Sequence, residues 1–235
     1  MTANLRLPRV ARFCTAWIIV ALTTTYLWSD APKANVSPDA ALQRLKEGNE
    51  RFAAGKPERP NSDVARRDDT GRNGQNPFAA VLGCADSRVP TEMVFDRGIG
   101  DLFVVRVAGN VADPGQMASL EYAADNLGVP LIVVLGHTKC GAVAAAVDNA
   151  ALKSHLGELV DRIKPAVETA RTDNPTLTGA DFLAAAIRAN VRRNMAELTK
   201  SSETIRKLSE AGKVKIVGGV YDIETGRVEW LPAGS

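Results

Sequence analysis

The chain has 235 residues, of which 45% are hydrophobic and 24% charged, the usual composition of a globular protein with one sizeable domain. This composition excludes a disordered chain, a collagen-like fibre and a protein with many membrane spans. The net charge of +2 and the aromatic content of 5% argue against a nucleic-acid-binding protein, whose affinity rests on clustered cations and stacking side chains.

Residues 1–31 are predicted to direct export. Three arginines precede an apolar run over residues 13–28, and a basic flank before about 15 apolar residues is typical of a secretory signal. A permanent span needs about 20 such residues, so the sequence leaves open whether this segment is a cleaved signal peptide or a retained membrane anchor. A buried amphipathic helix is disfavoured because there is no polar stripe at helical spacing. We expect an exported protein, periplasmic or anchored outside the cytoplasm.

The predicted catalytic domain, residues 32–235, differs in charge from the whole chain. Residues 1–31 contain three arginines, Asp30 and Cys14, so the remainder carries 26 side chains of each sign and two cysteines, Cys84 and Cys140. In an exported protein a remaining cysteine pair would ordinarily suggest a disulfide. The residues around these two cysteines favour a metal site instead.

Helical patterns recur along this domain. Ser37, Pro38 and Asp39 form a helix start, and apolar residues at helical spacing continue to about Ala54. The polar residues 56–76 are predicted to form a surface connection. Further helices are expected over residues 119–127, 142–149, 155–172 and 182–210, the last with a candidate break near Lys200.

Short apolar runs separate the helical patterns and are predicted to be buried parallel strands. They cover residues 78–83, 102–107, 131–136 and 214–220. A turn at residues 224–226 leads into residues 227–231, which predicts an antiparallel strand at one edge. The predicted fold class is therefore α/β: a single domain with a four-stranded parallel sheet plus one antiparallel edge strand, flanked by helices.

Potential metal ligands follow two of the predicted strands. Cys84 comes directly after the first strand, and His137 and Cys140, three residues apart, follow the third. Ligands of such sheets bind beyond the carboxyl ends of the strands, and a Cys₂His set with an open fourth position is typical of a catalytic zinc site. His155, the other histidine of the chain, lies in an ordinary helical pattern and is predicted to be a surface residue.

Taken together, these residues resemble the β-class carbonic anhydrases. The resemblance covers residues 39–231 and rests on residues 84–88, 137–141, 103–110, 119–123 and 219–222. It implies one Zn²⁺ per subunit and reversible hydration of CO₂ to bicarbonate and a proton by zinc-bound hydroxide. It also implies a homodimer or homotetramer whose active sites lie near the subunit interface.

Two residues near Cys84 are predicted to be catalytic. Asp86 is close enough to a ligand to accept a hydrogen bond from the attacking hydroxide, and Arg88 is placed to hold the Asp86 carboxylate in a charge-assisted pair. The resemblance adds that Asp86 can become a fourth zinc ligand in a closed state. It also matches Arg106 and Tyr221 to a bicarbonate pocket, although Val81 replaces the tryptophan of that pocket, which disfavours bicarbonate regulation.

Two glycines are also expected at the substrate site. Gly109 and Gly141 are predicted to allow a close backbone approach or a positive φ beside the metal.

Two alternatives to CO₂ hydration stay open. One is hydration of a CO₂ analogue, carbonyl sulfide or carbon disulfide, on the same site. The other is a non-catalytic zinc module or redox switch in which Cys84 and Cys140 form a disulfide.

Overall fold

The computed structural model describes residues 36–232. The predicted export segment, residues 1–31, lies outside the described residues. Within residues 36–232, no helix combines the length and the apolar character that a membrane crossing requires.

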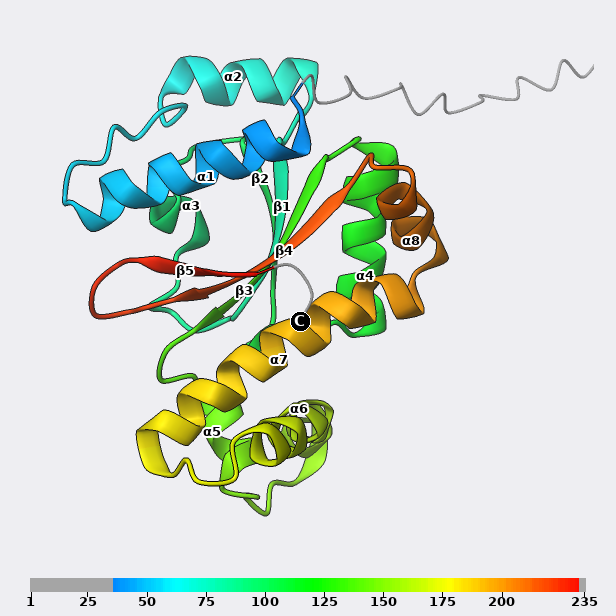
Figure 1. Ribbon diagram of the computed structural model, residues 1–235. Coiled ribbons are helices and arrows are strands. Elements are labelled where there is room, and N and C mark those ends of the chain that lie inside the picture. The colour runs from blue at the N-terminus through cyan, green and yellow to red at the C-terminus, as the bar shows by residue number, and fades with distance from the viewer. Residues whose placement is uncertain (1–35, 233–235) are drawn as a thin grey trace, which may run out of the picture.

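A five-stranded sheet forms the centre of the domain, with the strand order β2-β1-β3-β4-β5 (Figure 1). The strands are β1 (Ala79–Gly83), β2 (Leu102–Arg106), β3 (Leu131–His137), β4 (Lys215–Tyr221) and β5 (Val228–Leu231). The first four run parallel, and β5 is antiparallel to β4. The predicted fold class is confirmed, and every predicted strand boundary lies within one residue of the observed one.

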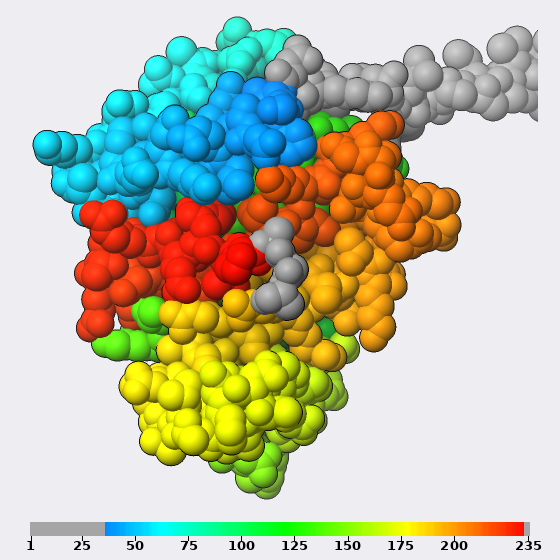
Figure 2. Space-filling view, in the orientation of Figure 1, coloured from blue at the N-terminus to red at the C-terminus, as the bar shows by residue number. Residues whose placement is uncertain are grey.

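Helices cover both faces of the sheet and create two separate cores. On one face, α1 packs its buried Ala41 and Leu45 against β1 and β3; on the other, α4 to α8 bury a larger apolar cluster. Figure 2 shows the surface of β5, in red, between those of α1, in blue, and α7, in yellow to orange. The helices are α1 (Pro38–Ala53), α2 (Val64–Asn73), α3 (Thr91–Val94), α4 (Pro114–Glu121), α5 (Gly141–Val147), α6 (Ser154–Asp173), α7 (Gly179–Ser201) and α8 (Glu203–Glu210).

This layering explains the apolar runs of the sequence. All residues of β1 and β3 are buried, because each strand has a neighbour on both sides and helices on both faces. By contrast, β2 lies at the sheet edge and its apolar residues are only half-buried. The carboxyl ends of β1 and β3 therefore lie side by side, which is the position that the predicted metal ligands require.

Two helix predictions differ from the structure, and one predicted helix break is confirmed. The connection predicted over residues 56–76 contains α2, whose start is capped by the Asp63 carboxylate 2.8 Å from the Arg66 N–H. No residue of α2 is buried, so it has no apolar stripe to reveal it. Helix α4 begins at Pro114, five residues before the predicted start. The break predicted near Lys200 in the long last helix is confirmed at Ser202, whose hydroxyl caps α8 by accepting from the Ile205 N–H.

Candidate metal centre and active site

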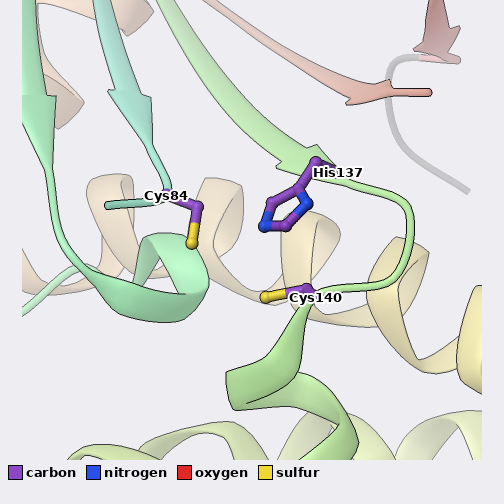
Figure 3. Close-up of side chains that lie close together, drawn as sticks. All are labelled: Cys84, His137 and Cys140. Carbon is purple, nitrogen blue, oxygen red and sulfur yellow. The ribbon is translucent and has the colours of Figure 1, made fainter. Parts of the chain in front are cut away.

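The three predicted metal ligands converge at the carboxyl ends of β1 and β3 (Figure 3). Cys84 directly follows β1, His137 is the last residue of β3, and Cys140 immediately precedes α5. Their ligand atoms all lie within 4.8 Å of one another. Cys84 is 3% exposed, Cys140 1% and His137 0%, so all three side chains are buried. Both cysteines are free thiols.

The imidazole of His137 shows that these residues fit a metal ion. Its Nδ1 lies 2.9 Å from the carbonyl oxygen of Thr138, and since a carbonyl only accepts, Nδ1 carries the proton and Nε2 offers a lone pair. That Nε2 is buried and has no hydrogen-bond partner among the described residues. Leaving a buried polar atom unpaired costs about 1–3 kcal/mol. Two thiols and one imidazole are the donor set of a catalytic zinc site with three protein ligands.

Backbone N–H groups support the Cys84 sulfur. The N–H groups of Asp86 and Gly109 donate to Sγ at 3.4 and 3.3 Å. The pKa of Cys84 is lowered to about 4, first by a hydrogen bond from Cys140, against the effect of burial, and then by these two N–H groups. The pKa of Cys140 is raised because it is the donor of that bond and is buried. The site thus stabilises a first thiolate by itself, and a cation would stabilise the second.

Arg88 holds the Asp86 carboxylate beside the ligand set. Oδ1 of Asp86 accepts from the Arg88 backbone N–H at 2.9 Å and from Nε at 3.0 Å, while Oδ2 accepts from a terminal guanidinium nitrogen at 2.8 Å. The side-chain bonds from Arg88 are the main reason that the pKa of Asp86 lies well below its usual value, despite partial burial. Oδ2 also lies 3.9 Å from Nε2 of His137, so an anionic oxygen stands next to the metal-facing side of the imidazole.

Arg106 has a role that the sequence analysis did not predict. Its Nε donates to the carbonyl oxygen of Cys84 at 2.9 Å, and its terminal nitrogen donates to that of Asp86 at 2.7 Å. This clamp ties the end of β2 to the loop that carries both the candidate metal ligand Cys84 and the Asp86 carboxylate. The partners are main-chain oxygens about 20 residues away in sequence, and no motif marks such a contact.

The other predicted substrate-site residues lie in different environments. Tyr221, paired with His137 across β3 and β4, is 4% exposed and packs against Phe52 of α1 with ring centroids 6.5 Å apart. Gly109 has the predicted positive φ, +70°. For Gly141 the prediction is wrong: its φ is not positive, and an added Cβ would meet no described atom within 4 Å. His155 is exposed, as predicted.

Comparisons with known proteins agree with this geometry. A family model described as carbonic anhydrase matches residues 79–228. Carbonic anhydrase 2 of Mycobacterium tuberculosis is 43% identical over 197 residues, covering 82% of this chain and 92% of its own. A carbonic anhydrase of Pseudomonas aeruginosa is 38% identical over 170 residues, covering 68% and 76%. The crystal structure of a β-carbonic anhydrase from Aspergillus fumigatus is similar with a TM-score of 0.67 at 28% identity, covering 84% of this chain and 91% of that one.

Proposed function

Since this chain belongs to the β-class carbonic anhydrases, we propose that it hydrates CO₂ reversibly with one zinc ion per subunit, bound by Cys84, His137 and Cys140. The observation that carries the proposal is the buried, unpartnered Nε2 of His137, which faces two cysteine sulfurs. No described residue forms a hydrogen bond with that nitrogen. A bound cation would complete the site.

When bound, zinc supplies the Lewis acidity that makes water a nucleophile at neutral pH. The residues of the chain supply orientation. The Asp86 carboxylate stays anionic because of Arg88, so it accepts a hydrogen bond and does not donate one. It therefore selects the protonated side of a reactant oxygen and turns that oxygen's lone pair toward CO₂. Arg106 fixes the carbonyls on either side of this loop, so Cys84 and Asp86 keep a constant relative position.

The proposal is tested by zinc analysis together with a CO₂-hydration assay on the wild type, Cys84→Ser and Asp86→Ala. We expect Cys84→Ser to lose both zinc and activity, because a serine hydroxyl is a poor zinc ligand. Asp86→Ala should keep zinc and turn over about 10–100-fold more slowly, the usual effect of removing a residue that supports a metal site. Stoichiometric zinc in Cys84→Ser would contradict the ligand set, and wild-type speed in Asp86→Ala would contradict the role of the carboxylate.

The same assay separates CO₂ from its analogues. We propose CO₂ as the substrate because the relatives matched above carry the name carbonic anhydrase. Turnover of carbonyl sulfide in excess of CO₂ turnover would favour the analogue, and a zinc-loaded protein without either activity would favour the non-catalytic module.

We further propose that the enzyme is exported, on the basis of residues 1–31 alone. Fractionation of the producing cell and N-terminal sequencing of the purified protein test this. Recovery from the extracytoplasmic fraction is expected, and the first residue found distinguishes a cleaved signal from a retained anchor. Recovery from the cytoplasm with an intact N-terminus would contradict export.

We propose self-association through the β2 edge of the sheet. The apolar strand β2 has a neighbour on one side only, and an apolar edge strand offers a template for pairing with another chain. A second copy of this chain would supply the cover, consistent with the homodimer or homotetramer that the family resemblance implies.

A further inference from the structure

Two asparagines of α7 lie behind the metal centre and are not used by the function proposed above. Asn190 is 1% exposed and Asn194 is 6% exposed. They are four residues apart, so both face the same side of the helix. Burying an amide side chain is unfavourable unless its hydrogen bonds are made, and the bonds of these two amides lead to the metal site.

Both amides bind the short segment that follows β2. Nδ2 of Asn190 donates to the carbonyl oxygen of Gly109 at 2.8 Å. Oδ1 of Asn194 accepts from the Ala112 N–H at 2.7 Å. Nδ2 of Asn194 donates to the backbone oxygen of Asn190 at 2.8 Å and to its Oδ1 at 3.2 Å. The segment is thus attached to α7 at both ends, and the second asparagine orients the first.

Gly109 connects this attachment to the metal ligand. Its N–H donates to Sγ of Cys84 at 3.3 Å, while its carbonyl is the group that Asn190 holds. The residue is also tightly packed, because a Cβ added there would lie 2.6 Å from Cδ1 of Ile163. The N–H and the carbonyl lie in two peptide planes joined at the Gly109 Cα, and rotation about φ or ψ is the only soft motion between them. Because the carbonyl is bonded to Asn190 and the residue packs tightly against Ile163, this rotation is restricted and the N–H keeps its direction toward Cys84.

We propose that Asn190 is a positioning residue for the metal ligand Cys84, acting through the Gly109 N–H. This inference rests on the proposed zinc site. A hydrogen bond to a ligating sulfur stabilises the thiolate and reduces the charge that it donates to the metal, and such outer contacts tune metal affinity. Asn190 would then influence how tightly the metal is bound and how strongly it acts as a Lewis acid, although it touches neither the metal nor the substrate.

The test replaces Asn190 by leucine, which keeps the volume and removes the donor. We expect zinc affinity, measured by competition with a chelator, to fall about 10–100-fold. In the cobalt-substituted protein, the sulfur-to-cobalt charge-transfer absorption should shift, because the Cys84 sulfur loses its fixed hydrogen bond. Asn190→Ala should produce the same two effects without any risk of overpacking.

Asn49→Leu is the matched control. Asn49 lies in α1, on the other face of the sheet. It is also a buried asparagine, 5% exposed, and its Nδ2 donates to the carbonyls of Val94 and Gly226. Its replacement should lower stability to urea by a similar amount and leave zinc affinity and the cobalt spectrum unchanged. Equal losses of zinc affinity in the two leucine variants would mean that Asn190 acts only through general stability, and would overturn the proposal.

The remaining outcomes are also decisive. A folded Asn190 variant with wild-type zinc affinity and cobalt spectrum overturns this inference while the proposed function stands. If the wild type binds no zinc, the proposed function fails first. If neither Asn190 variant folds, NMR of the cadmium-loaded wild type decides: a coupling between the Gly109 N–H and the cadmium nucleus, transmitted through the sulfur, is expected, and its absence overturns the proposal.

Discussion

Arg88 determines how the Asp86 carboxylate lies, because its backbone N–H and two guanidinium nitrogens donate to the two carboxylate oxygens. In Arg88→Gln the fixed, two-pronged contact is lost and the carboxylate can rotate. We expect CO₂ hydration to slow about 10–100-fold, the scale of a lost outer contact, at unchanged zinc content. Stopped-flow hydration rates and metal analysis of the same samples measure both quantities.

The chain offers a closely matched control for this substitution. Arg188 of α7 makes an equally two-pronged pair with Glu229 of β5, at 3.0 and 2.7 Å. Arg188→Gln removes the same kind of contact at a position that holds neither a ligand nor the carboxylate. Its hydration rate should equal that of the wild type, and an equal slowing of the two variants would refute the specific role of Arg88.

Gly109 and Gly141 should respond oppositely to alanine. In Gly109→Ala the new Cβ meets Cδ1 of Ile163 at 2.6 Å, and the φ of +70° becomes strained. A left-handed conformation costs about 1–2 kcal/mol and overpacking about 1–3 kcal/mol, so urea unfolding should show a loss of about 2 kcal/mol or more. Gly141 has open space and begins α5, so Gly141→Ala should be neutral or slightly stabilising. A neutral Gly109→Ala would contradict this account.

Among the elements, α1 is held to the rest of the domain by an ion pair between a partly exposed arginine and a buried carboxylate. Nε of Arg51, near the end of α1, lies 2.6 Å from Oδ2 of Asp96, whose side chain is 1% exposed. The N–H groups of Glu58 and Arg59 donate to the same carboxylate. Burial raises the pKa of Asp96, but the bonds from Arg51 and the two N–H groups outweigh burial, so the net pKa is lowered.

A lowered pKa in the folded state gives this pair a defined pH dependence. The stabilisation is fully present above the unfolded pKa of about 4 and is lost as the pH falls through the folded pKa. Arg51→Gln leaves a buried carboxylate without its cation, so it should lower the free energy of unfolding by about 3 kcal/mol at pH 7. The difference in unfolding free energy between the variant and the wild type should begin to narrow below about pH 4, where Asp96 of the unfolded chain takes up a proton, and should vanish as the pH falls through the lower pKa of folded Asp96. Urea unfolding at both pH values measures this, and a difference independent of pH would rule the mechanism out.

The sequence predicted the strands better than the helices, for a physical reason. A strand covered on both faces must be a continuous apolar run. Such a run can be recognised in a single sequence, as residues 131–136 show. The helix α2 is polar on every side, so hydrophobic periodicity could not find it, although Asp63 and Gly74 mark its two ends. Similarly, the start of α4 is marked by Pro114, a residue typical of the first turn of a helix, whereas the apolar periodicity begins only later in the sequence.

At the candidate site, the predictable part was the set of side chains close together in sequence. Cys84 with Asp86, and His137 with Cys140, come from two short motifs, and the topology of adjacent parallel strands brings the motifs together. The contacts of Arg106 and Asn190 were not predictable, because both residues bind main-chain oxygens distant in sequence. A backbone carbonyl has no sequence signature, so only the folded arrangement reveals such partners.

At the scale of the whole molecule, β2 is an edge strand whose outer side is available for pairing with a second copy. Asp101 and Val107 use their backbone groups toward β1: the Asp101 carbonyl accepts from Phe78, and Val107 bonds with Gly83 and Ala85. Because the direction alternates along a strand, the N–H and carbonyl of Val104, three residues from each, point away from the sheet. With charges of both signs balanced over residues 32–235, no net repulsion opposes the approach of a second copy.

Val104→Pro therefore tests whether this edge is the interface. Proline removes an outward N–H and no bond of the existing sheet, a substitution that edge strands tolerate, so the subunit should still fold. We expect light scattering coupled to size-exclusion chromatography to give a dimer or tetramer for the wild type and for the control Val104→Thr, which keeps the N–H. The proline variant should give a smaller species. If Val104→Pro assembles like the wild type, the contact between copies must lie elsewhere, because a proline at this position leaves no N–H with which a second chain could extend the sheet.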